Sequence, residues 1–467
     1  VRLYQSESDG APVGLLDRAK RIVEDMGYEV EVSRPGDRSG EAVDFGWEFE
    51  HELRGYQQKA MNAILTQGGG IVGLPTGAGK TVTFLAIAYA IGQRTIVLVH
   101  TKELLYQWAD VVRDVLDVEP GVIGDGEWSE GPVTIAIIQT LMSRGIKDLE
   151  GDYGVLCFDE CHRTSAADVM HEIGMDIDTE WRIGLSATPW RRVDGEELKI
   201  EAATGGEAFT ATAEDMIEDG YLSEPEFVTV NPEDYGDIVW GSQREEYADA
   251  YRRVIEMHPT RNTAVANAAA DLANRGYKVL INVDRIGQGK ILESVLNGDI
   301  HDVEGIRDAR KLSEVRESIE QIGLVADVGA VFLSGSDGSE RRNEVIDEFE
   351  NGDLNVLVST ILQEGVDIPD MNAIVLAQGG KSDIQQIQVI GRALRQSNGD
   401  SAVIVDFEDR GKWFKNHFKQ RQASMSEYYG KYGPDADTSV LEEEEPDDRI
   451  SLTDEPPTFD EIFGEDA

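Results

Sequence analysis

The sequence predicts an α/β protein made of two similar units, each built on a parallel β-sheet. Apolar runs of strand length alternate with segments of helical periodicity, the order expected when helices cover the faces of a parallel sheet. The length of 467 residues suits two or three domains of ordinary size. An apolar content of 40% and seven tryptophans exclude a wholly disordered chain.

The first unit is expected over residues 49–225, after a short N-terminal accessory element at 1–48. Its predicted strands are 71–74, 95–99, 133–138, 155–158 and 182–185, and its predicted helices include 81–91 and 103–116. In the accessory element, apolar residues at helical spacing between Gly14 and Met26 predict a helix that packs against the first unit.

The second unit is expected over residues 226–432, with no close sequence repeat linking it to the first. Its predicted strands are 278–283, 329–333, 355–358, 373–377 and 402–405, and its predicted helices include 341–349 and 384–394. The charged stretch 297–327 is typical of an inserted helix. The acidic tail 433–467 is too poor in apolar residues to build a core, and we expect it to be disordered.

The net charge of -47, from 90 acidic and 43 basic residues, is extreme. At about 1 M salt the Debye length is only about 3 Å, so the self-repulsion of such a chain is screened. We therefore expect a protein from a halophile; the alternative is an acidic protein with acidic partners. The sequence has no apolar run of membrane-spanning length and no signal segment, and we expect a cytoplasmic protein.

A glycine-rich loop follows the first predicted strand and precedes a helix. Its sequence is Leu74-Pro75-Thr76-Gly77-Ala78-Gly79-Lys80-Thr81. Phosphate binding requires backbone N–H groups in a loop that glycine permits, the N-terminus of a helix and one lysine. We therefore expect the loop to bind a nucleoside triphosphate, with Lys80 at the outer phosphates and Thr81 as a ligand of Mg²⁺.

Two carboxylates come directly after the apolar strand 155–158, in the run Asp159-Glu160-Cys161-His162. At the end of a strand beside a phosphate loop, one carboxylate can hold the metal through water, and its neighbour can orient or deprotonate the attacking water. We predict that Asp159 holds Mg²⁺ and that Glu160 is the general base. Cys157 and Cys161 are expected to be packing residues, because two cysteines cannot complete a zinc site or a disulfide framework.

Together with Ser186-Ala187-Thr188, these motifs resemble those of a superfamily 2 helicase of the DEAD/DEAH type. The similarity spans residues 50–430 and includes Glu364-Gly365-Val366-Asp367-Ile368-Pro369 and Gln388-Val389-Ile390-Gly391-Arg392-Ala393-Leu394-Arg395. The runs Ala187-Thr188-Pro189 and Asp406-Phe407-Glu408-Asp409 are similar to the XPB-like and phage UvsW-like branch. The resemblance implies two tandem RecA-like domains with a nucleotide cleft between them, ATP and Mg²⁺ as cofactors, and a nucleic-acid-stimulated ATPase.

The resemblance also implies roles for single residues. Gln57 would contact the adenine base, Asp367 would contact the ribose or couple to strand binding, and Gln388 would belong to the catalytic motif. The residues that would couple the γ-phosphate to closure of the two lobes are His162, Ser186 and Thr188. Gln288 departs from the family pattern, because relatives usually carry His at its position.

Arg392 and Arg395 lie three residues apart, a spacing that predicts one helical face, at the end of the predicted helix 384–394. Phosphoryl transfer builds negative charge on the equatorial oxygens, and a cation that reaches in from a partner is worth about 10³–10⁵ in rate. We assign both residues as arginine fingers from the second unit. The alternative is a solvated stripe on a surface helix.

Nucleic-acid contacts are expected from uncharged groups, because free cations are few. The strand-contacting motifs that the resemblance indicates contain Thr101, Gln139, Thr140, Thr360 and Gly365. Contacts of this kind reach phosphates and carry no sequence information, so we expect sequence-independent binding, with duplex or branched DNA favoured. Trp108 and Trp413 can stack on bases, but packing is the favoured role for each.

The leading interpretation is an ATP-dependent DNA helicase or duplex translocase in repair, recombination or replication restart, acting as a monomer. One alternative is the motor subunit of a restriction or phage-defence system, which shares these motifs. Another is an ATP-binding remodeller without productive hydrolysis, against which the intact Glu160, Arg392 and Arg395 argue. In the tail, Phe459, Ile462 and Phe463 among acidic residues can form a docking motif for a partner protein, or are simply part of the tail.

Overall fold

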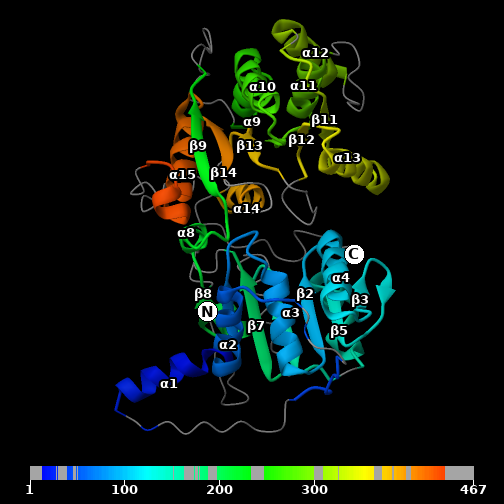
Figure 1. The fold of residues 1–467 in the computed structure, drawn as a ribbon, viewed down its shortest axis with the longest axis vertical. Helices are drawn as coiled ribbons and strands as arrows, with labels where there is room; N and C mark the ends of the chain where they lie inside the picture. The colour runs from blue at the N-terminus through cyan, green and yellow to red at the C-terminus, as the bar shows by residue number, and fades with distance from the viewer. Residues whose placement is uncertain are drawn as a thin grey trace, which may run out of the picture.

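The computed structural model contains two parallel-sheet units, stacked along the longest axis of the molecule in Figure 1. It describes residues 13–27, 29, 39–45, 49, 51–150, 152–161, 173, 177, 179–187, 197–232, 247–298, 309–323, 325–361, 371–380, 383–395 and 401–436. The acidic tail from 437 onward lies outside these residues, and so does its candidate docking motif. Within the described ranges, no helix is long and apolar enough to span a membrane.

The first sheet has eight strands in the order β4-β3-β5-β2-β6-β7-β1-β8. Every neighbouring pair is parallel except β3 and β4. The strands are β1 (Gly70–Gly73), β2 (Thr95–Val99), β3 (Gly121–Gly124), β4 (Glu127–Trp128), β5 (Val133–Ile137), β6 (Val155–Phe158), β7 (Trp181–Ser186) and β8 (Glu207–Thr210). Because β1, β2 and β5 to β7 are almost fully buried, they read in the sequence as continuous apolar runs.

The helical segments of the first half include two that follow predicted functional motifs directly, α3 after the phosphate loop and α4 after Thr101. The helices are α1 (Leu16–Asp25), α2 (Gly55–Gln67), α3 (Lys80–Ile91), α4 (Lys102–Leu116), α5 (Ile138–Arg144), α7 (Glu197–Thr204) and α8 (Ala213–Glu218). The described residues of this half also contain two short 3₁₀ turns, η1 (Val13–Leu15) and η2 (Ile146–Asp148).

The second sheet has six parallel strands in the order β11-β12-β10-β13-β14-β9. These are β9 (Glu224–Val230), β10 (Val279–Asn282), β11 (Ala330–Leu333), β12 (Val356–Ser359), β13 (Ala373–Leu376) and β14 (Ser401–Phe407). The helices are α9 (Tyr247–Tyr251), α10 (Pro259–Asn274), α11 (Ile286–Asn297), α12 (Ala309–Ile322), α13 (Ser339–Asn351), α14 (Asp383–Ala393) and α15 (Lys412–Tyr429), with a π-helical turn η3 (Arg252–Glu256) and a 3₁₀ turn η5 (Gly430–Tyr432).

All ten predicted strands are present, and four strands were not predicted: β3, β4, β8 and β9. The expected boundary between residues 225 and 226 falls inside β9, which pairs with β14 over seven residues of the second sheet. The inserted stretch contains the helix α12, whose Val315 and Ile319 are buried in the core of the second unit.

The N-terminal helix differs from the prediction that it packs along the first unit. Only its start is held, where Leu15 is buried and Arg18 pairs with Glu201 of α7 at 2.6 Å. Further along α1, Ile22 is 49% exposed and Met26 is 68% exposed. Figure 1 shows the reason, since α1 extends away from the body of the first unit.

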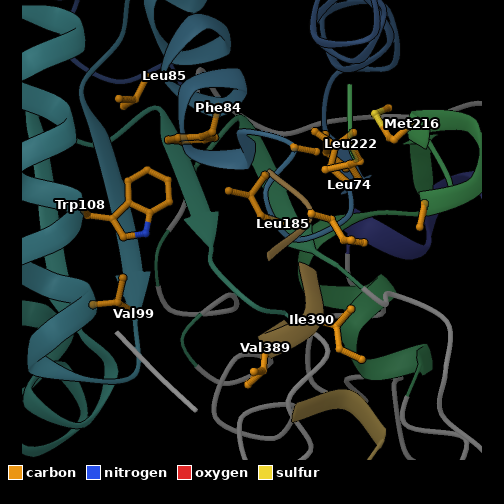
Figure 2. Close-up of a cluster of buried hydrophobic side chains, with 14 of the residues drawn as sticks. Leu74, Phe84, Leu85, Val99, Trp108, Leu185, Met216, Leu222, Val389 and Ile390 are labelled. Atoms are coloured by element: carbon orange, nitrogen blue, oxygen red, sulfur yellow. The ribbon is translucent and has the colours of Figure 1, made fainter. Parts of the chain in front are cut away.

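One hydrophobic cluster joins the two units (Figure 2). Leu74 and Leu185 of the first sheet share it with Met216 and Leu222 of the connecting segment and with Ile390 of α14. Because α14 contributes to this cluster, the second unit is packed directly on the side of the first unit where β1 ends.

Two buried ion pairs stabilise the second unit around the run that resembles the XPB-like branch. Asp409 accepts hydrogen bonds from Arg261 at 2.6 and 2.9 Å, and both side chains are fully buried. Asp406 pairs in the same way with Arg421, at 2.9 Å. In the run 406–409, which resembles the XPB-like branch, the first and last aspartates therefore form internal ion pairs with arginines of the second unit.

We predict that Asp409→Ala lowers the free energy of unfolding by about 3–5 kcal/mol, because it leaves the guanidinium of Arg261 buried without its carboxylate. The control is Asp271→Ala, which removes the exposed partner of Arg275 and should change stability by at most about 1 kcal/mol. Denaturant titration of both variants measures the difference. Equal effects of the two substitutions would contradict the prediction.

Candidate active site between the two sheets

The phosphate loop has the backbone shape that its sequence predicts. Gly77 and Gly79 have φ angles of +85° and +73°, in the left-handed region that favours glycine. Lys80 and Thr81 begin α3, so the N-terminus of this helix faces the loop. The hydroxyl oxygen of Thr76 is buried and has no hydrogen-bond partner. A loop with an unpartnered hydroxyl and a helix N-terminus fits a phosphate group.

Lys80 lies against the predicted general base. Its Nζ is 3.4 Å from Oε1 of Glu160, and both side chains are largely buried, at 13% and 18% exposed. Glu160 has a φ angle of +48°, an uncommon conformation for a residue other than glycine. The turn after β6 thus directs this carboxylate at the lysine of the phosphate loop.

Asp159 is buried beside Glu160. Burial, and next the charge of Glu160, raise the pKa of Asp159 from 3.8 to about 6. Its Oδ1 accepts a hydrogen bond from the backbone N–H of Glu160 at 3.0 Å. Asp159 and Thr81 are the residues that could hold Mg²⁺ here, and phosphates and water would supply its other ligands. The described part of the chain contains no cluster of three or more acidic, histidine or cysteine ligands.

Trp108 of α4 positions Asp159, a contact that the sequence did not indicate. The indole Nε1 donates a hydrogen bond to Oδ2 of Asp159 at 2.8 Å, and the ring packs edge-on against Phe84 of α3. With 2% exposure, Trp108 is a packing residue, as favoured, and it cannot stack on a base (Figure 2). Because Thr101 caps the N-terminus of α4, this helix connects a predicted nucleic-acid contact to the predicted metal carboxylate.

The raised pKa of Asp159 predicts a pH-dependent stability. Between pH 3.8 and about 6 the native protein holds the proton that the unfolded chain has lost, so stability falls as pH rises through this window. Asp159→Asn should therefore stabilise the metal-free protein by about 3 kcal/mol above pH 6 and have little effect below 3.8.

Urea unfolding of the wild type and Asp159→Asn across this pH range, without nucleotide or metal, measures the difference. Asp152→Asn, which changes an exposed carboxylate of the same unit, is the control. A stabilisation by Asp159→Asn that does not vary with pH would contradict the raised pKa.

The start of α2 is attached to the phosphate loop. The hydroxyl of Tyr56 donates to the carbonyl of Ala78 at 2.6 Å, and the amide of Gln57 donates to the carbonyl of Gly79 at 3.4 Å. Gln57 also accepts a hydrogen bond from the backbone of Arg54 at 2.9 Å. The structure thus places Gln57 beside the loop, and its contact with adenine stays a prediction.

Tyr221 joins this group, although no motif marks it in the sequence. Its ring meets Tyr56 edge-on with 4.8 Å between centroids, and the guanidinium of Arg54 lies 5.6 Å from its centroid. Tyr221 belongs to the segment that leads into β9 and the second sheet. The connection between the units therefore touches the element beside the phosphate loop.

The predicted arginine helix lies against the phosphate loop. A Cβ atom at Gly391 of α14 would lie 2.6 Å from the Cβ of Thr76, and one at Gly77 would lie 3.3 Å from Cγ of Arg395. The backbone N–H of Ser223 donates to the carbonyl of Leu394 at 2.8 Å and fixes the end of α14. Gln388 and Arg392 are half-buried on α14. Arg395 is also half-buried, but α14 ends at Ala393, and Arg395 pairs with Leu222 in an isolated β-bridge instead of lying on the predicted helical face.

The remaining predicted site residues are distributed along the strand ends. Ser186 is buried at the end of β7, and its carbonyl accepts from the N–H of Leu74 at 3.0 Å. Thr101 caps α4, since its hydroxyl accepts from the N–H of Leu104 at 3.3 Å and keeps its own proton to donate. Gln139 and Thr140 lie in the first turn of α5, and Thr360 follows β12. Four predicted residues lie outside the described ranges: His162, Thr188, Gly365 and Asp367.

Gln288 is buried within the second unit. Its amide donates to the carbonyls of Ile255 and Ala377, at 3.1 and 3.2 Å, and to the side chain of Asn262 at 3.2 Å. The residue that departs from the family pattern, Gln288 in place of the usual His, therefore makes internal contacts between α11 and its neighbours.

Two family models match the chain. Residues 50–191 match the type III restriction enzyme, res subunit, and residues 306–397 match the helicase conserved C-terminal domain. A Rad25 protein of Haloarcula marismortui is 30% identical over 83% of this chain, which spans just over half, 56%, of that relative. The DNA 3'-5' translocase XPB2 of Sulfurisphaera tokodaii is 26% identical, over 77% of this chain and 82% of its own length.

A solved structure supports the architecture. S. cerevisiae Dbp5 bound to RNA and ADP BeF3 aligns with a TM-score of 0.53 and 17% identity, over 82% of this chain and 88% of Dbp5. At this identity the likeness shows the fold, which is two RecA-like units. The fold, the two family models and the Rad25 and XPB2 relatives agree with the motifs around the phosphate loop. The chain belongs to the superfamily 2 helicases, with its similarity in the XPB-like branch.

Proposed function

We propose that this chain is the motor of an ATP-dependent DNA helicase or duplex translocase. The observation that carries the proposal is the contact of Gly391 and Arg395 with Thr76 and Gly77, because it divides one nucleotide site between two sheets. ATP can close a site of this kind, and hydrolysis can open it. The relatives named as a DNA translocase and as Rad25 support DNA as the track.

The residues of the first unit would bind the nucleotide and activate the attacking water. Lys80 exchanges its contact with Glu160 for the outer phosphates. Thr81 and Asp159 would hold Mg²⁺, and the ion when bound would supply positive charge at the phosphate oxygens. Glu160, released from the lysine, orients the attacking water and accepts its proton.

The residues of the second unit would complete the site. Arg392 of α14 and Arg395, just beyond the end of α14, would place guanidinium groups against the charge that develops on the phosphate, and Gln388 would support them from α14. The groups that bind the rest of the nucleotide are Gln57 and Asp367, with the loop residues Thr76, Gly77, Ala78 and Gly79. The groups that transmit closure are His162, Ser186 and Thr188. Alternate grip by the two units then gives directed stepping.

The track is held mainly by uncharged groups. These are Thr101, Gln139, Thr140, Thr360 and Gly365, which reach phosphates without reading bases. Such contacts suit a chain of net charge -47 in molar salt. At that salt concentration, the release of counter-ions from nucleic acid contributes less to binding, so charged contacts lose their advantage. The haloarchaeal relative fits this environment. We further propose a cytoplasmic monomer that acts in repair, recombination or replication restart, with the acidic tail as a candidate contact for a partner protein.

The test is ATP turnover with single-stranded, duplex, forked and RNA-containing substrates, together with strand displacement on the forked DNA. We expect DNA to stimulate turnover and the stimulation to persist at about 1 M KCl, because short screening lengths leave uncharged contacts intact. No stimulation by any nucleic acid would overturn the proposal. If DNA-stimulated turnover were highest below about 0.2 M KCl, only the proposal that the protein is adapted to high salt would be overturned.

The match of residues 50–191 to a restriction-enzyme family model favours one second candidate, the motor subunit of a restriction or defence system. Such a subunit would translocate on duplex DNA without separating the strands. Displacement of a triplex-forming strand from duplex DNA, with no unwinding of forked DNA, would support this candidate over a helicase.

A further inference from the structure

The helix α15 carries an unusual concentration of basic residues for this chain. Between residues 410 and 425 there are five basic residues and no acidic one, whereas the whole chain has 90 acidic and 43 basic residues. Figure 1 shows α15 on the flank of the second unit formed by β9 and β14. No motif that contributes to the proposed function lies on this helix.

Two of these basic side chains remain without partners. Lys415 and Lys419 are exposed, and neither side chain makes an ion pair or a hydrogen bond in the described part of the chain. Two other exposed lysines do take acidic partners, Lys102 with Asp125 and Lys431 with Glu218. At a spacing of four residues the two lysines lie side by side, where like charges repel. Their arrangement therefore suits an anionic ligand.

Two aromatic rings are exposed beside the start of this helix, Trp413 on α15 itself and Tyr247 on α9. Trp413 is 37% exposed and Tyr247 is 39% exposed, with 6.1 Å between their centroids and an interplanar angle of 88°. Tyr247 also packs on the buried rings of Tyr251 and Phe414. Because these rings are held by their neighbours, they lose little conformational entropy when a ligand binds. Their flat apolar faces are the kind of surface on which bases stack.

The rings lie at the edge of the sheet where the strands end, the edge that also carries Thr360. The N–H of Val283, just after β10, donates to the carbonyl of Ser359 at 3.0 Å and places these strand ends side by side. Arg285 follows on this edge, with its guanidinium 5.5 Å from the centroid of Tyr251. The edge is thus continuous from a predicted phosphate contact to the exposed rings.

We propose that Tyr247, Trp413, Lys415 and Lys419, here called the α15 surface, bind single-stranded nucleic acid. Bases stack on the two rings, and the lysines contact the phosphates. This inference rests on the proposed function and extends its track beyond the uncharged contacts. The combination of flat aromatic faces, unpaired lysines and the shared strand edge favours a nucleic-acid strand over an acidic peptide such as the chain's own tail.

The test measures binding of a labelled oligothymidylate to the full-length chain across a salt series. Trp413→Ala should weaken binding by about 5- to 150-fold, the effect of losing one stacked base. Lys415→Gln with Lys419→Gln should lower the slope of log affinity against log salt by about 1.4, which is about 0.7 for each phosphate contact on a single strand. ATP turnover without nucleic acid should not change, because none of the ring contacts and hydrogen bonds among the described residues joins the α15 surface to the phosphate loop.

Two matched controls share the exposure of these residues. Val228→Ala changes an apolar residue of β9 that is also 37% exposed, and Lys59→Gln changes an exposed lysine of α2. Neither should alter the affinity or the salt slope. Thermal unfolding of each variant checks that the fold is intact.

The difference in fluorescence between the wild type and Trp413→Phe gives a second measurement, which does not depend on affinity. Quenching of this signal by the oligonucleotide supports stacking. Quenching by a peptide of residues 437–467 but not by the oligonucleotide would identify an acidic peptide as the occupant and overturn the proposal. Wild-type affinity in both variants would also overturn it, whereas failure of every nucleic acid to stimulate turnover would overturn the proposed function itself.

Discussion

Arg395→Ala is expected to lower ATP turnover by about 10³–10⁵-fold, the effect of removing a guanidinium from the charge that develops in phosphoryl transfer. The reason is local geometry, because the Cγ atom of Arg395 lies against Gly77 of the phosphate loop. Nucleotide binding should change little, since Lys80 and the loop backbone remain. Turnover at saturating ATP, with binding of a fluorescent ADP analogue measured in parallel, separates the two effects.

Two further variants sharpen this test. Arg395→Lys should recover little activity, because an ammonium cannot reproduce the planar fork of a guanidinium. Arg275→Ala is the matched control, an arginine of the same unit that pairs with Asp271 at the surface of α10. Turnover of Arg395→Ala within tenfold of the wild type would remove this residue as an arginine finger and weaken the assignment of a divided site.

The strands that the sequence predicted are those that the sheets bury on both faces, such as β2 and β12. The missed strands have other patterns. β9 (Glu224–Val230) has only Pro225 buried, and it is held by its pairing with β14 along seven residues. β8 is exposed or half-buried throughout. Pairing with a neighbour determines these strands, and an apolar run cannot reveal that.

The candidate site also contains some residues that the sequence could predict and others that it could not. Motifs predicted the phosphate loop, Asp159 and Glu160, because phosphate and metal chemistry fix the residue types along a short stretch of chain, and the structure brings Lys80 within 3.4 Å of Glu160. The bond from Trp108 to Asp159 joins residues 51 positions apart, and Tyr221 reaches Tyr56 only through the connecting segment. Contacts of this kind depend on how the helices pack on the sheet. Packing also decides α1, because the sequence predicted a helix packed against the first unit, whereas the structure leaves Ile22 and Met26 exposed.

Glu160→Gln is expected to lower turnover by about 10²–10⁴-fold, the usual contribution of a general base. The amide keeps the shape of the side chain but cannot accept the proton of the attacking water. Because the change also removes the ion pair at 3.4 Å, Lys80 is released and nucleotide affinity should be equal to that of the wild type or higher. Loss of turnover with preserved affinity is therefore the expected pattern, measured by single-turnover hydrolysis and by ADP binding.

Two comparisons separate this role from a merely structural one. Lys80→Ala should lose affinity as well as turnover, because the lysine contacts the phosphates, whereas Glu160→Gln should lose turnover alone. Glu180→Gln, at an exposed position next to β7, should change neither. If Glu160→Gln bound nucleotide more weakly, the ion pair with Lys80 would be shaping the loop for phosphate, and Glu160 would act by positioning. If Glu160→Gln hydrolysed ATP at the wild-type rate, Glu160 would not be the general base. Asp159, the other carboxylate in the turn after β6, could not easily replace it, because Asp159 is hydrogen-bonded to Trp108 and assigned to the metal.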